Sequence, residues 1–93
     1  MFKSMTEVRR ANAAAGNHWF EPGTMRFFRS RVSDRLYGGR YFVSSERAPR
    51  GARRYTVRVA NDDGSIGTVG EFQAFASRGA AHRRAAWLAK EGA

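Results

Sequence analysis

The side chains best suited to acid–base or metal chemistry are sparse in this sequence of 93 residues. Its two histidines, His18 and His82, are far apart along the chain, and no cysteine is present to act as a nucleophile or a zinc ligand. His18 adjoins Trp19, and His82 lies inside a predicted helix. We therefore expect no metal site, and we expect both histidines to be hydrogen-bonded or solvent-facing residues without a ligand.

The eight carboxylates form no pair that has the spacing of a catalytic acid and base. Asp62 and Asp63 are adjacent, but they precede Gly64 in a segment typical of a tight turn. Gly38 and Gly39 are not followed by the lysine and hydroxyl residue of a phosphate-binding loop. The sequence therefore predicts a protein that is not an enzyme and that uses no cofactor.

Arginine is the residue type with the clearest functional potential. Seventeen lysines and arginines stand against eight acidic residues, which gives a net charge of +9. Between Arg26 and Arg58 there are ten arginines and two acidic residues, so this stretch alone carries a net charge of +8. The planar guanidinium binds phosphate and carboxylate groups and stacks on aromatic rings and bases. The stretch therefore predicts contact with nucleic acid or with an acidic protein surface.

The same arginines have a second interpretation. A genome of high GC content encodes arginine where others encode lysine, and the abundant alanine and glycine agree with such an origin. The cations would then form an ordinary solvated face with no partner. The sequence leaves both interpretations open.

One predicted hairpin loop brings four arginines together whatever the details of the fold. These four are Arg47, Arg50, Arg53 and Arg54, and we expect them to contact the partner. Arg50 is the simplest to test, because it lies in the loop between Pro49 and Gly51. The expected partner-binding residues, including those on the following strand and the last helix, are Arg47, Arg50, Arg53, Arg54, Arg58, Arg83, Arg84 and Trp87. We expect six aromatic residues to lie in the core: Phe27, Phe28, Phe42, Tyr55, Phe72 and Phe75.

Helical patterns flank the arginine-rich stretch. Ser4 and Glu7 have the spacing of a capping box for a helix over residues 5–15, and Gly16 is placed to end it. Its apolar stripe is thin, so we expect it to pack weakly at the periphery. Pro22 begins a short helix. Ser77 caps a last helix that runs to about residue 91 and is closed by Gly92, with a core stripe of Ala81, Ala85, Leu88 and Ala89.

Three segments have the composition and alternation of strands, at residues 40–46, 53–60 and 65–72. Asn61-Asp62-Asp63-Gly64 predicts a hairpin between the last two. The order of elements predicts an α+β fold: a three-stranded antiparallel sheet with the N-terminal, short and C-terminal helices packed on one face. We expect one domain over residues 1–93, with residues 1–3 and 92–93 frayed.

Three linked motifs carry a resemblance: TMRFF-x-SR at 24–31, YGGRYFV-x-SE at 37–46 and DGSI-x-TVGEFQ at 63–73. Together they resemble a family of small proteins carried by phages, prophages and plasmids, over about residues 12–90. The resemblance implies a mobile-element protein and supplies no catalytic residues. Small proteins of such elements include anti-CRISPR proteins, which act without catalysis by occupying a surface of a host complex.

The resemblance and the arginines together favour one function and leave one alternative. We expect a non-enzymatic, anti-CRISPR-like protein that inhibits a host defence nucleoprotein, a CRISPR effector complex, by binding its surface. The alternative is a regulatory protein that binds DNA or RNA directly through its basic hairpin. No run of 18 apolar residues and no signal-peptide pattern is present. We therefore expect a monomer or homodimer in the cytoplasm of the bacterial host, without membrane contact.

Overall fold

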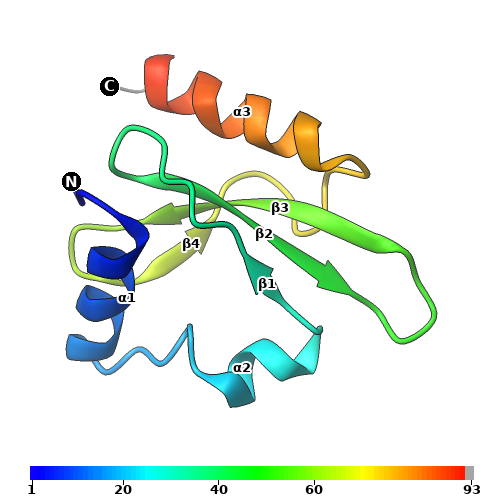
Figure 1. The fold of residues 1–93 in the computed structure, drawn as a ribbon, viewed down its shortest axis with the longest axis horizontal. Coiled ribbons are helices and arrows are strands. Elements are labelled where there is room, and N and C mark those ends of the chain that lie inside the picture. The colour runs from blue at the N-terminus through cyan, green and yellow to red at the C-terminus, as the bar shows by residue number, and fades with distance from the viewer. Residues whose placement is uncertain (92–93) are drawn as a thin grey trace.

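A four-stranded antiparallel sheet, in the order β1-β2-β3-β4, forms the centre of the fold (Figure 1). The structure is a computed structural model, in which residues 1–91 are described. Two helices precede the sheet and one follows it, which confirms the α+β class. The elements are α1 (Met5–Ala14), α2 (Pro22–Phe27), β1 (Arg31–Val32), β2 (Tyr41–Arg47), β3 (Arg53–Ala60), β4 (Ile66–Thr68) and α3 (Arg78–Glu91).

The expectation of three strands was wrong by one. Strand β1 contains only Arg31 and Val32, which pair with Ser45 and Ser44 of β2. Two residues are too few to show the alternation by which a strand is recognised in a sequence. Strand β4 is also shorter than the predicted 65–72, because the chain leaves the sheet after Thr68 and reaches a left-handed conformation at Gly70, where φ is +76°.

The helices lie on both faces of the sheet, which corrects the expectation that they share one. Neighbouring residues of a strand point to opposite faces, and both faces of β2 and β3 are buried. On one face α1 contributes Met5 and Val8 to a core with Phe42 and Ala60. On the other face α3 contributes to a second core, which consists of Val43, Val57, Ala81 and Ala85.

Helix α1 is part of the first core and is not peripheral. The Oγ of Ser4 accepts a hydrogen bond from the backbone N–H of Glu7, which confirms the predicted cap. Val8 is 1% exposed, and the equally buried Asn12 replaces an apolar side chain on this stripe. Asn12 donates from Nδ2 to the carbonyl of Gly64 over 2.9 Å, and its Oδ1 accepts from the N–H of Trp19. The thin stripe packs well because its polar member is hydrogen-bonded through both its amide nitrogen and its amide oxygen.

Helix α3 approaches the sheet through small residues. Ala81 and Ala85 are fully buried, and the Oγ of Ser77 accepts from the N–H of Ala80, as the predicted cap requires. The predicted end at Gly92 and the predicted fraying of residues 92–93 lie outside the described residues. At the other terminus Phe2, which we expected to fray, is held by a 2.9 Å hydrogen bond from its N–H to the carbonyl of Gly39.

The aromatic residues divide between core and surface. Phe42 is fully buried as predicted, but Phe27 is 80% exposed and Phe72 is 43% exposed, so the expectation of a core position was wrong for these two. Helix α2 is only six residues long and buries none of them. Within residues 1–91 no helix combines the length and apolarity needed to cross a membrane.

Candidate functional site

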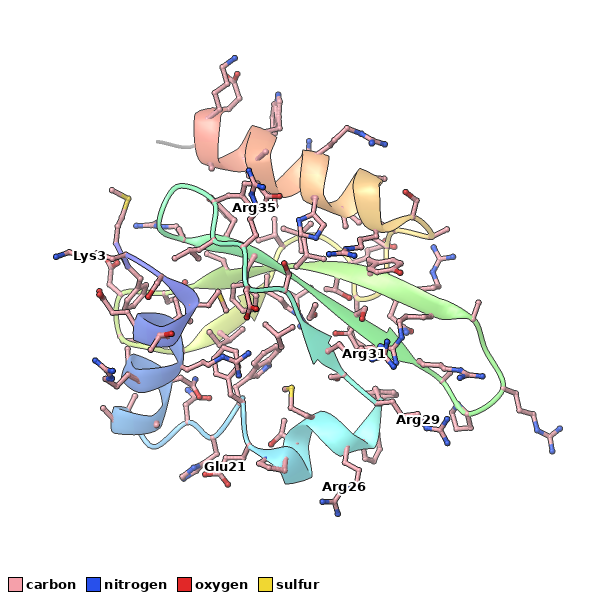
Figure 2. The ribbon with its side chains drawn as sticks, viewed as in Figure 1. Lys3, Glu21, Arg26, Arg29, Arg31 and Arg35 are labelled. Atoms are coloured by element: carbon pink, nitrogen blue, oxygen red, sulfur yellow. The ribbon has the colours of Figure 1, made fainter. Side chains whose placement is uncertain are left out.

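Arginines gather where the β2–β3 hairpin, β1, α2 and the start of α3 meet. Arg47 and Arg53 are directly opposite each other in the β2–β3 ladder, and Arg31 of β1 pairs with Ser45 two residues away on the same face. Figure 2 shows Arg26, Arg29 and Arg31 following one another from α2 into β1. We call the following seven residues the arginine surface: Arg26, Arg29, Arg31, Arg47, Arg50, Arg53 and Arg78.

Two hollows connect all of these arginines except Arg50, which lies on the hairpin loop and lines neither. An open groove of about 440 Å³ lies between α2 and the hairpin and is lined by Arg26, Arg29, Arg31, Arg47 and Arg53. A more enclosed pocket of about 250 Å³ lies between β1, the hairpin and the first turn of α3. Arg31 and Arg53 line both hollows, so the groove and the pocket form one continuous cationic surface.

The arginine surface has no acidic partner of its own. Within residues 1–91, none of its seven guanidinium groups lies within 4.0 Å of a carboxylate oxygen. Partial burial, and after it the positive charge of Arg31, lower the pKa of the Arg53 guanidinium below its ordinary value. The surface therefore combines like charges that an external anion would stabilise.

The structure brings three of the four predicted hairpin arginines into this surface. Arg47, Arg50 and Arg53 belong to it, and Arg53 is fixed by hydrogen bonds from Nη1 to the carbonyl and the hydroxyl of Ser45. Arg54 points to the opposite face. It donates from Nε to the carbonyl of Gln73 over 2.7 Å and from Nη2 to that of Ala74 over 3.2 Å, so its side chain holds the loop that follows β4.

Arg58 is buried and is not part of an exposed contact surface, which corrects its inclusion among the partner-binding residues. It is 9% exposed, and its Nη2 lies 3.2 Å from Oε2 of the buried Glu46. Its Nε donates to the Oγ of Ser44, and its guanidinium lies between the rings of Trp19 and Phe72. Thr56 and Arg58 lie on the face of β3 that α1 and the loop after β4 cover, so Arg58 is satisfied internally.

The predicted residues on α3 lie apart from the two hollows. Arg83 folds back over the first turn of the helix, where its Nη1 packs close to Gly79. The guanidinium of Arg84 lies 4.5 Å from the ring centre of Trp87, and Trp87 is 49% exposed. None of these three side chains lines the groove or the pocket. They form a second exposed site on the outer side of α3.

The residues that complete the arginine surface and its pocket were not among the predicted partner-binding residues. Arg26, Arg29 and Arg31 were counted in the arginine-rich stretch, but only the pairing of β1 with β2 places them beside the hairpin. Arg78 and His82 had a usable signal, because the cap at Ser77 puts them one turn apart at the start of a helix. The ring of His82 accepts or donates a 2.8 Å hydrogen bond between Nδ1 and the Tyr37 hydroxyl, and its Nε2 is buried without a partner.

The chemistry available to this surface is hydrogen bonding and charge pairing with anions. In the described part of the chain, no three histidine, aspartate or glutamate side chains lie close enough to share a metal ion. Guanidinium groups donate several hydrogen bonds in one plane and stay charged at all physiological pH values. A row of them fits a ligand that presents repeated negative charges.

Comparison with known proteins identifies a family and no function. Neither the curated proteins nor the solved structures contain a match to the chain. The model of DUF7447, a family of unknown function, matches residues 4–86. This match includes every strand of the sheet, the whole hairpin and the first turns of α3. The chain therefore belongs to the DUF7447 family.

Proposed function

We propose that the protein binds nucleic acid without catalysing a reaction on it, and that its arginine surface contacts the phosphate backbone. The observation that carries the proposal is the convergence of seven arginines without carboxylate partners at one end of the sheet. Phosphate groups repeat along a nucleic acid at intervals of several ångströms, and a row of arginines neutralises several at once. A lone acidic residue on a protein would satisfy only one of these cations.

The arginine surface differs from an ordinary solvated face, and this difference favours nucleic-acid binding. Arginines on solvated faces commonly lie near acidic residues, as Arg40 does with its Nη2 3.7 Å from Asp62. Six of the seven arginines of this surface line two connected hollows, and they come from α2, the turn after it, β1, β2, β3 and α3. Burial first, and the positive charge of Arg31 second, lower the pKa of the Arg53 guanidinium. A bound polyanion would offset the repulsion among these like charges.

The test is binding of labelled DNA and RNA over a series of salt concentrations. We expect an affinity that falls steeply with salt, with a slope of about 0.9 for each phosphate contacted on duplex DNA. A triple variant that replaces Arg26, Arg47 and Arg50 by Gln should lower the slope by about three contacts. These three side chains are exposed.

The matched control removes the same charge elsewhere. Replacing Lys3, Arg10 and Lys90 by Gln also lowers the net charge of +9 by three, and these residues are exposed outside both hollows. This control should keep most of the wild-type slope. Equal losses in both triple variants would mean that net charge alone drives binding, and no binding at low salt would overturn the proposal.

A second candidate is the inhibition of a host defence nucleoprotein that the mobile-element resemblance implies. The observation that favours it is the exposure of Phe27 and Trp87, each close in sequence to an exposed arginine, Arg26 or Arg84. Tryptophan and arginine are among the residue types that dominate protein–protein interfaces. Its test is co-purification with the subunits of CRISPR effectors, together with a phage plating assay. No complex and no protection of phage across effector types would reject this candidate.

A further inference from the structure

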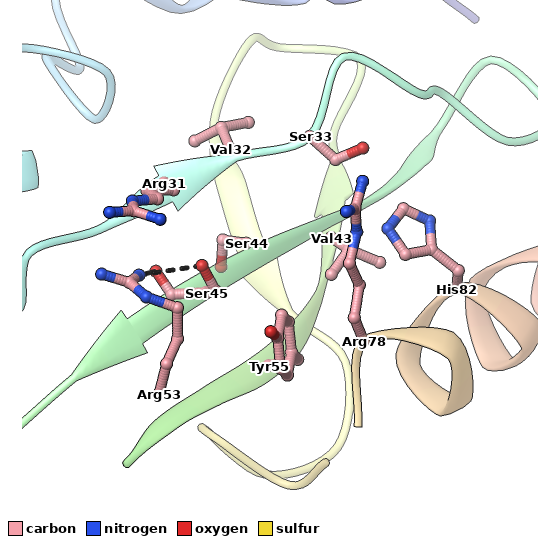
Figure 3. A pocket seen from close by; sticks show the side chains of 10 residues that line it. All are labelled: Arg31, Val32, Ser33, Val43, Ser44, Ser45, Arg53, Tyr55, Arg78 and His82. Atoms are coloured by element: carbon pink, nitrogen blue, oxygen red, sulfur yellow. Dashed lines mark hydrogen bonds between the residues drawn. The ribbon is translucent and has the colours of Figure 1, made fainter. Parts of the chain in front are cut away.

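The pocket beside the first turn of α3 differs from the open groove in its shape and in its chemistry. It holds about 250 Å³ and is built by four elements, β1, β2, β3 and α3. Figure 3 shows Arg31 and Arg53 on one side, Arg78 and His82 on the other, and Tyr55 between them. Cations therefore approach the enclosed space from opposite sides.

Every charged side chain that lines this pocket is positive. Arg31, Arg53 and Arg78 contribute three guanidinium groups, and the lining includes no aspartate or glutamate. The Nη1 of Arg53 is committed to Ser45 at 2.9 Å and 3.2 Å, which holds the group in place. Its Nε and Nη2 have no hydrogen-bond partner among the described residues. The group is thus pre-oriented and still has donors to offer a ligand.

Neutral polar side chains and apolar walls complete the pocket. Tyr55, Ser33 and His82 line it, and the Nε2 of His82 is buried without a partner within residues 1–91. Val32 and Val43 supply apolar wall between these groups. Hydrogen bonds and charges act more strongly beside apolar walls, because less water screens them.

The combination fits a compact anion with about two negative charges and several free oxygens. A phosphodiester inside a nucleic-acid strand has one charge and carries a sugar on each side. A terminal phosphomonoester carries a charge of about −1.5 to −2 at pH 7 and three oxygens that accept hydrogen bonds. Three guanidinium groups around one pocket match the second ligand better than the first.

We propose that this pocket binds a terminal phosphomonoester, either the phosphorylated end of a nucleic acid or a free nucleotide. The inference deepens the proposed function and rests on it for the nucleic-acid source of the phosphate. The open groove, lined by Arg26, Arg29 and Arg47, would then contact the diesters that follow the bound end, because it shares Arg31 and Arg53 with the pocket.

The test compares one oligonucleotide with a 5′-phosphate, a 3′-phosphate or hydroxyls at both ends. We expect one phosphorylated form to bind at least about tenfold more tightly than the hydroxyl form, as charge-assisted hydrogen bonds of ordinary strength would give. In Arg31→Gln and Arg78→Gln this preference should fall to about one. Both side chains are exposed and make no hydrogen bond to the rest of residues 1–91, so the variants should fold.

The control variant is Arg50→Gln, whose residue belongs to the arginine surface but not to the pocket. It should weaken all three oligonucleotides alike and keep the preference for the phosphorylated end. Equal affinity of the wild-type protein for all three forms would overturn the pocket proposal and leave the proposed function intact.

A titration with AMP and with inorganic phosphate, followed by the NMR signals of His82 and Tyr55, separates the two sources. If AMP shifts these signals and binds as tightly as the best oligonucleotide, the pocket serves a free nucleotide. Much tighter binding of the oligonucleotide indicates a nucleic-acid end. If no oligonucleotide binds, the proposed function fails, and the titration still decides the pocket: saturable shifts that Arg78→Gln abolishes support it, and unchanged signals reject it.

Discussion

At the scale of the residue, arginine has two distinct roles in this protein. Arg58 is buried and satisfied, with a carboxylate, two hydroxyls and two aromatic rings around it. Arg50 is exposed at the tip of the hairpin and has no hydrogen-bond partner within the described chain. A buried charge requires complete pairing, whereas an exposed one remains available to an external ligand. Burial, which the sequence pattern did not reveal, separates the two roles.

The buried pair should be strongly coupled. Glu46→Gln would leave Arg58 as an uncompensated buried cation, and Arg58→Met would leave Glu46 as a buried anion. We expect each single variant to lose about 3–5 kcal/mol of unfolding free energy. The double variant should lose clearly less than the sum, which urea denaturation of all four proteins would measure. Additive losses would show that the two side chains act independently.

His82 should make the stability depend on pH. Burial, followed by the charges of Arg78 and Arg35, lowers the pKa of His82 below its ordinary value of 6.5, and the remaining polar neighbour is the Tyr37 hydroxyl. The unfolded chain therefore takes up a proton at a higher pH than the folded one. Above pH 6.5 the titration of His82 does not change the free energy of unfolding. As the pH falls from 6.5 to the lowered pKa, the unfolded chain is protonated first and the free energy of unfolding decreases. His82→Asn should reduce the loss of unfolding free energy on acidification.

The wild-type protein supplies the control for this measurement. Its unfolding free energy in urea is compared with that of His82→Asn at neutral and at mildly acidic pH. An identical loss in His82→Asn and the wild-type protein would exclude His82 as its source.

At the scale of the element, the contact between α1 and the β3–β4 turn depends on one glycine. Gly64 has φ of +89°, and a Cβ built there would lie 2.5 Å from the carbonyl oxygen of Ala11. Gly64→Ala should therefore combine backbone strain of about 1–2 kcal/mol with overpacking of about 1–3 kcal/mol. Gly16→Ala is the matched control, because Gly16 has φ of +72° but nothing within 4 Å of such a Cβ. Thermal or urea unfolding should show a clearly larger loss of unfolding free energy for Gly64→Ala than for Gly16→Ala. Equal losses would mean that α1 moves away from the new Cβ without loss of stability.

The elements also show what the sequence could predict and what it could not. Strand β3 was predicted with its correct bounds, Arg53–Ala60, because eight residues display the alternation clearly. Strand β1 was missed because Arg31 and Val32 are recognised as a strand only through their partners on β2. The prediction of the site was incomplete for the same reason. The hairpin arginines could be predicted from local sequence, whereas Arg31 and Arg78 lie beside them only through tertiary pairing and packing.

At the scale of the whole molecule, one sheet serves two cores. The radius of gyration is 12.6 Å, close to the roughly 12 Å that scaling gives for a single domain of this length. Phe42 belongs to the core under α1, and the next residue, Val43, belongs to the core under α3. The two cores are thus separated by no more than the thickness of β2 and β3, and the arginine surface lies at the hairpin end of these same strands.

This arrangement predicts that the protein unfolds as one unit. Release of α3 would expose Val43 and Val57, whose strands also hold α1 in place, so neither core keeps its support when the other is lost. Small single domains commonly unfold in this all-or-none manner. In a urea titration followed by NMR, the native amide signals of Val8 in α1 and Ala85 in α3 should disappear with the same midpoint. Loss of the Ala85 signal at a distinctly lower urea concentration would show that α3 detaches first, and the phosphate pocket at its first turn would then open before the rest of the fold.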